Sequence, residues 1–403
     1  MEGQPMLKRE MYLERIRPFY HTDLIKILAG VRRSGKSVML GQIYRELADS
    51  GVPEESLVRL NLEFGEYADI GTWKELYETL SGLLPATGTP YLFLDEVHNV
   101  PGFEKALNAL RAEHGCSIFV TGSGGALLPG ELSTVLTGRA VTFKVMPFTY
   151  RESLALTRLR GIVMEDPFGD YLKYGGMPHR FAFPPGGPTV QYLNDTFTAI
   201  VYKDVVQRAG VSNIDLLERI VGFMVDNTSK IFSANSVRKF LRSQGREVSA
   251  DALYSYVGYL VSSLLVNRVG RYDLKGKKHL ATLEKYYLTD PGFFGTRLSR
   301  RELDIGAILE TVAHNELVAR GYRVSIGKIG GHEVDFVAEK DGETSYFQVC
   351  YMLGGSEERE FRSLEAIDDN RPKYLVSMDP LDMSRRGIRH LRFVEDFLLS
   401  DEF

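Results

Sequence analysis

The chain has 403 residues, which is too long for one ordinary hydrophobic core, so two or three domains are expected. An apolar fraction of 44% and a charged fraction of 25% are typical of folded globular proteins and exclude wholesale disorder. The formal net charge of −4 excludes a global basic field, so any nucleic-acid contact must come from a local patch.

The first 150 residues alternate between apolar runs and helical periodicity, a pattern that favours a parallel sheet covered by helices. The predicted strands span 24–29, 57–62, 91–94, 117–120 and 141–145, and the predicted helices span 36–49, 73–84 and 103–114. We therefore predict an α/β domain over residues 1–150.

The remaining chain divides into three predicted parts. Glycine and proline punctuate 167–188, so residues 151–210 are predicted to be a helical linker or lid. Helices at 232–241 and 249–266, followed by a hairpin at 268–287, favour a winged-helix domain over residues 211–295. A small α/β domain over residues 296–403 is predicted from helices at 305–320 and 357–367 and strands at 334–338, 346–351 and 374–376.

A phosphate-binding loop is the most specific motif. Eight residues, from Gly30 to Ser37, fit GxxxxGK[ST] in full between a strand and a helix. Glycines allow such a loop to wrap phosphates, and its backbone N–H groups supply positive potential. Lys36 is expected to reach the β and γ phosphates of ATP, and Ser37 to bind Mg²⁺; the alternative is a glycine-rich turn with an exposed lysine. The predicted nucleotide-binding residues are Gly30, Val31, Arg32, Arg33, Ser34, Gly35, Lys36, Ser37 and Val38.

Two acids end the apolar run at 91–94 and are predicted to complete the site. Asp95 is expected to hold the Mg²⁺ shell, and Glu96 to polarise the attacking water. The alternative is that the two acids cap a following helix, because a turn containing Pro101 comes next.

Two further catalytic residues are predicted. Ser123, after the strand at 117–120, is chosen over Thr121 as a sensor of the γ phosphate, with a plain glycine-rich turn as the alternative. Arg139 is a candidate arginine finger that acts within or across subunits, with an ordinary surface arginine as the alternative. Arg32 and Arg33 are expected to support neighbouring loops.

Several short sequence motifs carry a family resemblance that extends over nearly the whole chain. They are 30–37, Asn61-Leu62-Glu63, 94–98, Thr121-Gly122-Ser123, 136–139, 147–152, 174–178 and Lys203-Asp204-Val205. With them the chain resembles the archaeal and bacterial AAA-type ATPases that carry a poorly characterised carboxy-terminal domain. The resemblance implies ATP binding and hydrolysis, a winged helix and a restriction-endonuclease-like terminal domain. Gly124 departs from the family, where a small polar residue is more usual.

The terminal domain looks like the PD-(D/E)xK nuclease pattern, in which an acid and an acid-x-lysine on adjacent strands bind Mg²⁺. Asp335 fits the first position, and Glu310 or Glu316 would complete the set from a helix. Gln348 and Cys350 replace the second acid and the lysine, and neither supplies the required charge. We therefore predict a domain that has lost cleavage, with Asp335 as a structural residue.

A basic hairpin, carrying Arg268, Arg271, Lys275, Lys277 and Lys278, could contact double-stranded DNA, although charged hairpin tips are normally just solvated. The leading hypothesis is an ATPase motor or switch, with residues 174–178 in the relay. The alternatives are an ATP-gated protein-binding module with slow turnover and an active ATP-dependent nuclease.

The two cysteines and the hydropathy of the chain indicate the cellular compartment. Cys116 and Cys350 lie far apart in apolar, strand-like contexts, so no disulfide framework is expected. Because no stretch is long and apolar enough for a signal peptide or a bilayer span, we expect a cytoplasmic protein without membrane contact. The resemblance to AAA-type ATPases also implies a homo-oligomer, in which Arg139 would act across subunits.

Overall fold

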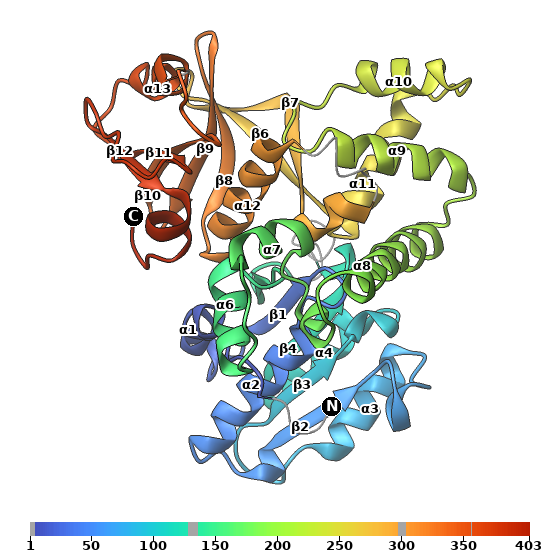
Figure 1. The fold of residues 1–403 in the computed structure, drawn as a ribbon. Coiled ribbons are helices and arrows are strands. Elements are labelled where there is room, and N and C mark those ends of the chain that lie inside the picture. The colour runs from blue at the N-terminus through green and yellow to red at the C-terminus, as the bar shows by residue number, and fades with distance from the viewer. Residues whose placement is uncertain (1–4, 128–135, 297–303, 356) are drawn as a thin grey trace. The chain divides into compact units, whose positions relative to one another are not determined.

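The computed structural model describes residues 5–127, 136–296, 304–355 and 357–403. The chain divides into two compact units (Figure 1). The first unit contains residues 6–145 with 262–264, and the second is formed mainly by residues 146–261 and 265–403.

The first unit is a parallel sheet with helices, as its sequence predicts. Its strands lie in the order β2-β3-β4-β1-β5, and every pairing is parallel. The strands are β1 (Ile25–Gly30), β2 (Leu57–Asn61), β3 (Tyr91–Asp95), β4 (Ser117–Ser123) and β5 (Ala140–Lys144). The helices are α1 (Glu10–Ile16), α2 (Lys36–Asp49), α3 (Trp73–Leu83) and α4 (Phe103–His114).

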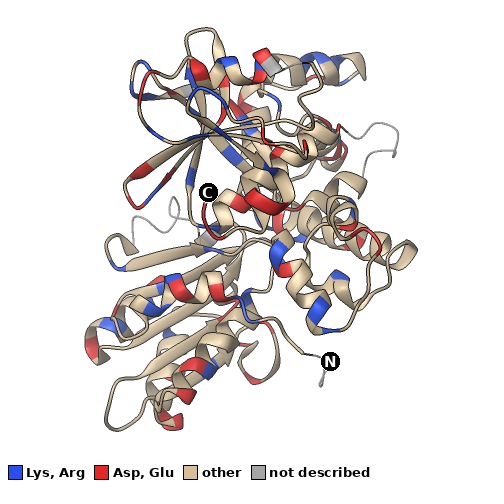
Figure 2. Cartoon of the chain, turned by 60° about the vertical axis from the view of Figure 1, so that its left-hand side comes forward, with Lys and Arg blue, Asp and Glu red and all other residues tan. Residues whose placement is uncertain are grey.

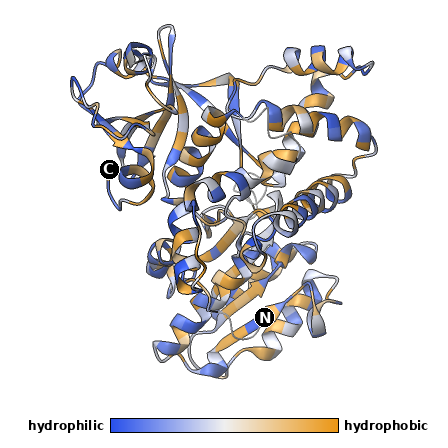
Figure 3. Cartoon of the chain, in the orientation of Figure 1, coloured by the Kyte–Doolittle hydropathy of each residue, from blue (hydrophilic) through white to orange (hydrophobic). Residues whose placement is uncertain are grey.

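Burial explains why these segments become strands. Every residue of β1, β3 and β4 is buried, as expected for parallel strands covered on both faces. Hydrophobic residues concentrate on these strands in Figure 3. The predicted bounds of α2 and α4 are confirmed, because glycines in the left-handed region, Gly35 and Gly115, mark the start of one helix and the end of the other.

The second unit begins with helices and ends in a mixed sheet. Its helices are α6 (Tyr150–Leu159), α7 (Pro167–Tyr174), α8 (Gly187–Ala199), α9 (Ile214–Asp226), α10 (Ala234–Ser243), α11 (Ala250–Ser262), α12 (Ile305–Ala319) and α13 (Glu357–Glu365). Its strands are β6 (Val266–Asp273), β7 (Lys278–Leu288), β8 (Arg323–Ile329), β9 (His332–Lys340), β10 (Glu343–Val349), β11 (Lys373–Ser377) and β12 (Ile388–Arg392).

One seven-stranded sheet, in the order β12-β11-β10-β9-β8-β6-β7, unites the predicted hairpin and the predicted terminal domain. Strand β6 pairs in parallel with β8, with Arg271 opposite Ile326. The predicted boundary between 295 and 296 therefore does not separate two independent cores. Sequence periodicity missed this because strand pairing across a long connection leaves no local signal.

The helix predicted at 249–266 is also shorter than expected. It ends at Ser262, Leu264 adopts a positive φ of 60°, and Val266 already belongs to β6. A left-handed backbone at a branched aliphatic residue interrupts a helix, and the tertiary structure imposes it here against local preference.

Helices α12 and α13 cover opposite faces of the second sheet. One core contains Leu309 and Val312 of α12 with Phe336 and Phe347 of the sheet. The other contains Phe361 and Leu364 of α13 with neighbouring strand residues. The carboxy-terminal part of this unit is thus a three-layer arrangement of helix, sheet and helix. No helix within the described residues is long and apolar enough to span a membrane.

Candidate nucleotide site

The predicted phosphate loop connects β1 to α2 at the carboxyl edge of the first sheet. Gly30 ends β1, and a Cβ atom there would lie 2.3 Å from the carbonyl oxygen of Val145 and 2.8 Å from Ser34 Oγ. Gly35 has a φ of 95° and directly precedes the first helical residue. The two glycines therefore allow the tight turn that points the first N–H groups of α2 into the loop.

Lys36 and Ser37 follow on the first turn of α2. The ammonium of Lys36 donates to the carbonyl oxygens of Gly30 and Val31, each at 3.1 Å, and the residue is 3% exposed. Ser37 Oγ donates to Asp95 Oδ1 at 2.9 Å. The loop and the end of β3 therefore meet through a hydroxyl and a carboxylate, the oxygen donors that Mg²⁺ prefers.

Asp95 is buried where three strand ends converge. Asn61 Nδ2, at the end of β2, donates to Asp95 Oδ2 at 3.4 Å, and the two residues are register partners. The hydroxyl of Thr121 on β4 donates to Asp95 Oδ1. Neighbouring strands thus orient this carboxylate, and Asn61, which no motif had marked as a site residue, is one of the groups that hold it.

Glu96 adopts a left-handed backbone, with a φ of 55°. Its N–H donates to Thr121 Oγ1 at 3.0 Å, and its Oε2 accepts from the N–H of Ser123 at 3.2 Å and lies 3.2 Å from His98 Nδ1. Burial raises the pKa of Glu96, while the nearby charge of Lys36 lowers it. An unusual backbone held by specific contacts is typical of functional positions.

The choice of Ser123 over Thr121 is not supported by side-chain contacts with the two acids. Thr121 is the hydroxyl that touches both Asp95 and Glu96, whereas Ser123 contributes its backbone N–H to Glu96. Ser123 does lie beside the loop, as the register partner of Gly30. The sensor role of Ser123 remains a prediction.

Because Glu96 is the predicted general base and is buried, we expect turnover to fall at acidic pH. Because Glu96 must be ionised to accept a proton, kcat should be full above its raised pKa and should fall as the pH falls through it. The half-maximal point should therefore lie above the ordinary glutamate value of about 4.3. A steady-state pH profile checks this, with circular dichroism at each pH to show that the chain stays folded. A kcat that stays constant down to pH 4.3 would contradict it.

The predicted finger, Arg139, lies at the opposite edge of the sheet from the phosphate loop. Its carbonyl accepts from the N–H of Ile25, the first residue of β1, and its guanidinium donates to Asn108 Oδ1 at 3.3 Å. The structure therefore does not bring Arg139 to the nucleotide site of its own chain. A role across subunits stays a prediction.

Of the two loop arginines, Arg32 contacts a neighbouring segment, and a supporting role of Arg33 stays a prediction. Arg32 forms an ion pair with Glu63 at 2.9 Å, just after β2, while Arg33 is exposed. A support that the sequence did not indicate comes from Arg9, whose buried guanidinium donates to the carbonyl of Ser34 at 3.2 Å. Val38, the last residue of the predicted set, is 43% exposed at the start of α2.

The predicted nuclease-like residues are partly brought together in the second unit. Asp335 on β9 accepts from the N–H of Val349 at 2.9 Å, and its own N–H donates to Gln348 at 3.3 Å. Glu316 does not join them, because it pairs with Arg320 at 2.6 Å. Glu310 contacts Lys285, which also lies near Asp335.

One of the five cations of the basic hairpin is buried. Arg271 is 8% exposed, whereas the exposed Arg268 forms an ion pair with Glu284 at 3.4 Å. The side chains of Lys275, Lys277 and Lys278 are exposed around the turn. Asp273 Oδ1 shapes that turn by accepting from two backbone N–H groups, those of Lys275 and Gly276.

Comparison with known proteins identifies two regions of the chain. Residues 22–154 match the family described as an AAA domain, and residues 165–304 match a domain of unknown function, DUF8612. An uncharacterized protein of Haemophilus influenzae is 32% identical over 401 residues, which cover 98% of this chain and 100% of that protein. An uncharacterized protein of Methanocaldococcus jannaschii is 27% identical over 360 residues, covering 86% of this chain and 79% of that protein.

A solved structure has the same kind of fold. The Walker-type ATPase of Pyrococcus abyssi superposes with a TM-score of 0.52 at 14% identity, covering 72% of this chain and 95% of that chain. At this identity the likeness concerns the fold alone. Together with the AAA-domain match, it establishes the first unit as an AAA-type P-loop ATPase domain.

Proposed function

This chain belongs to the same family as an uncharacterized protein of Haemophilus influenzae, and from that premise and its AAA domain we propose that it binds ATP with Mg²⁺ and hydrolyses it. The observation that carries the proposal is the 2.9 Å hydrogen bond from Ser37 Oγ to Asp95 Oδ1. This hydrogen bond joins the phosphate loop to the end of β3 that carries the two acids. Neither the loop motif nor the pair of acids requires by itself that the two segments meet.

The donor set fits a magnesium nucleotide. Ser37 and Asp95 would hold the ion, Lys36 would turn from the loop carbonyls towards the β and γ phosphates, and the N–H groups from Gly35 onward would surround them. The chemistry supplied by bound Mg²⁺ would be neutralisation of the charge that develops on the phosphates. Asn61 and Thr121 would keep the Asp95 carboxylate in place.

Glu96 is the proposed general base. Its carboxylate would accept a proton from the attacking water, and its contacts with His98 and with the N–H of Ser123 orient it for that task. Because its pKa is raised, the Glu96 carboxylate is a stronger base than the carboxylate of an exposed glutamate. We propose Ser123 and Arg139 as auxiliary residues, with Arg139 acting on a neighbouring copy in a homo-oligomer.

The proposed output is a conformational switch in the second unit, with a winged helix among its parts. A short bridge between Ile231 and Lys285 follows α9, then come α10, α11 and the hairpin β6–β7. Helices joined by a short turn and followed by a two-stranded hairpin are typical of DNA-binding modules. Residues 174–178 are the proposed relay.

The distribution of lysine and arginine residues limits where double-stranded DNA would bind. Figure 2 shows acidic and basic residues interspersed along the described chain. Helix α11, which would occupy the groove in a helix-turn-helix, contains no lysine or arginine. Phosphate contacts would therefore come from the exposed hairpin lysines or from α10.

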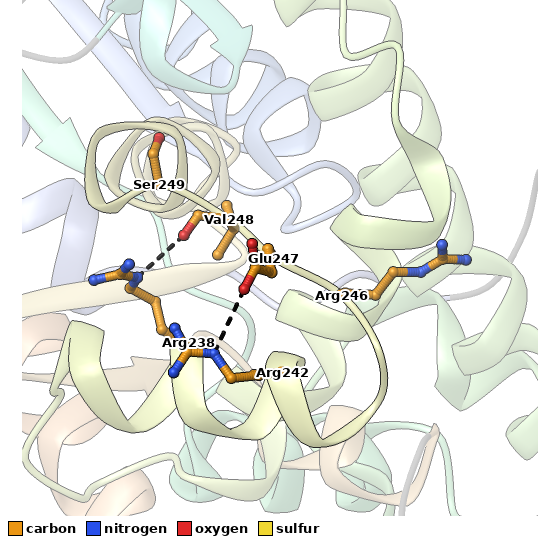
Figure 4. Close-up of a pocket in the computed structure, with 6 residues that line it drawn as sticks. All are labelled: Arg238, Arg242, Arg246, Glu247, Val248 and Ser249. Carbon is orange, nitrogen blue, oxygen red and sulfur yellow. Dashed lines mark hydrogen bonds and ion pairs between the residues drawn. The ribbon is translucent and has the colours of Figure 1, made fainter.

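A pocket of about 280 Å³ beside α10 is lined by three arginines (Figure 4). Arg238 donates to the carbonyl of Val248 at 3.1 Å, and Arg242 lies 3.8 Å from Glu247. The guanidinium of Arg246 points away from the other two and pairs with Asp215 at 3.0 Å. The ion pairs of Arg242 and Arg246 are exposed and hold these two arginines only weakly, because exposed ion pairs contribute little to stability.

A second candidate function is an ATP-gated protein-binding module with slow turnover. The observation that favours it is the surface of α11, where Tyr254 is 49% exposed and no cation is present. Such a surface suits a protein partner better than a phosphate backbone.

Phosphate release, measured with and without duplex DNA, separates these functions. We expect hydrolysis that DNA stimulates, and binding that weakens as salt rises. In a Lys275→Ala/Lys277→Ala/Lys278→Ala variant, the slope of log affinity against log salt should become shallower by about 0.9 for each lysine that contacts a phosphate. Lys340→Ala, an exposed lysine on β9, is the matched control.

Other outcomes also discriminate between the candidates. A salt slope that survives in the hairpin variant but falls in Arg238→Ala/Arg242→Ala would assign the contact to α10. Hydrolysis that is indifferent to DNA, together with no salt-dependent binding, would contradict the DNA role and favour the protein-binding module. Absence of hydrolysis under all conditions would contradict the enzymatic proposal itself.

A further inference from the structure

A buried lysine lies among carboxylates at the predicted nuclease-like position of the second unit. Lys285 is on β7, and its side chain is 5% exposed. Its Nζ is 2.8 Å from Glu310 Oε1 of α12, 2.8 Å from Glu333 Oε1 and 3.8 Å from Asp335 Oδ1, the last two on β9. One ammonium therefore contacts three carboxylates that come from two different elements.

Further hydrogen bonds fix two of these carboxylates. The phenol of Tyr287, two residues after Lys285, donates to Glu310 Oε1 at 2.7 Å. The N–H of Val349 on β10 donates to Asp335 Oδ2 at 2.9 Å. Because buried charges are tolerated only when they are paired and hydrogen-bonded, the cluster is a built feature of the fold.

The two residues that break the nuclease pattern bring no charge to the cluster. Gln348 Oε1 accepts from the N–H of Asp335 and from Ser363 Oγ, and its Nε2 donates to Glu360 at 3.1 Å. Burial raises the pKa of Cys350 to about 12, so this thiol carries no charge at neutral pH. Gln348 therefore adds no charge and little free coordinating capacity to the cluster.

The carboxylates also do not form a metal-binding group. Within the described parts of the chain, no cluster of three or more His, Cys, Asp or Glu side chains is arranged to hold a metal ion. The contacts of 2.8 Å from Lys285 to Glu310 and Glu333 are ordinary for charge-assisted hydrogen bonds. The positive charge that holds these acids together is thus part of the chain.

We propose that the ammonium of Lys285 takes the place of a divalent cation in this cluster, so that the nuclease-like region folds without a metal. A lysine brings one positive charge where Mg²⁺ brings two, and its ammonium lies within hydrogen-bond distance of both Glu310 and Glu333. The hydrogen bonds from Tyr287 to Glu310 and from the N–H of Val349 to Asp335 stabilise the acids further. The inference deepens the prediction that this region has lost cleavage, and it does not depend on ATP hydrolysis.

Mn²⁺ binding to the nucleotide-free full chain, followed by the EPR signal of free Mn²⁺, tests the proposal. We expect the Asp335→Asn variant to bind as much Mn²⁺ as the wild-type chain does. Lys285→Met should gain one equivalent of Mn²⁺, and the double variant Lys285→Met/Asp335→Asn should lose it again. Lys340→Met, which replaces an exposed lysine at the end of β9, is the matched control and should behave as wild type.

Two results would overturn the proposal. One is wild-type Mn²⁺ binding that Asp335→Asn abolishes, because the acids would then bind a metal beside the lysine. The other is a folded Lys285→Met that gains no Mn²⁺.

Thermal unfolding keeps the test decisive if Lys285→Met folds poorly. Removing one partner of a buried ion pair should lower its Tm by roughly 6–20 °C, and Mn²⁺ should restore part of that loss, whereas Lys340→Met should show neither effect. No rescue by Mn²⁺ would count against the proposal. ATP hydrolysis, measured on the same samples, reports separately on the first unit, so the two proposals can fail independently.

Discussion

Replacing Glu96 by glutamine is expected to leave ATP bound and to lower kcat by about 10²–10⁴-fold, the usual contribution of a positioned general base. The amide keeps the shape of the side chain, so the contacts with the N–H of Ser123 and with His98 need little rearrangement. It cannot accept the proton of the attacking water. Binding is measured with a fluorescent ATP analogue, and turnover by phosphate release.

The control for this variant is Glu113→Gln, which removes an exposed carboxylate on α4 at a distance from the predicted site. It should bind and hydrolyse ATP as wild type does. Unchanged turnover in Glu96→Gln would show that another residue activates the water. Loss of binding and turnover together would instead assign Glu96 to the binding of the nucleotide.

Gly176→Ala is expected to destabilise the second unit by about 3 kcal/mol or more, since overpacking against rigid atoms is among the largest single-residue effects. A Cβ atom there would lie 1.9 Å from the carbonyl oxygen of Phe148 and 3.1 Å from its nitrogen. The same two backbones are hydrogen-bonded, since the N–H of Phe148 donates to the carbonyl of Gly176 at 2.8 Å. Neither can move away without breaking that bond.

Differential scanning calorimetry should therefore show the second unit melting roughly 6–12 °C lower in Gly176→Ala. The N–H of Gly176 also donates to the buried carboxyl of Asp290 at 2.8 Å, so displacement would disturb a buried acid as well. Gly187→Ala is the matched control, because a Cβ there meets nothing within 4 Å. Equal melting temperatures for the two variants would show that the backbone at 176 can relax.

The first unit could be predicted largely from its sequence. Its strands are apolar runs that are buried on both faces, and its helices begin and end at local signals such as Gly35 and Gly115. The phosphate loop depends on eight consecutive residues, so it needed no long-range information. The acids at the end of β3 could be located for the same reason.

The groups that orient those acids could not be predicted in the same way. Asn61 and Thr121 reach Asp95 only because β2, β3 and β4 end at one edge of the sheet in that order. The position of Arg139 at the opposite edge likewise follows from strand register. A local pattern gives the residue type at a position, and the topology decides which residues become neighbours.

The phosphate loop, the pair of acids after an apolar strand, and the replacement of charged residues by Gln348 and Cys350 can all be read from neighbouring residues along the chain. The joining of the hairpin to the terminal sheet, which brings Lys285 into contact with Glu310 and Glu333, becomes visible in the folded structure alone. The reason is physical. Motifs are set by adjacent residues, whereas the pairing of a buried charge depends on strands and helices far apart in the sequence that meet when the chain folds.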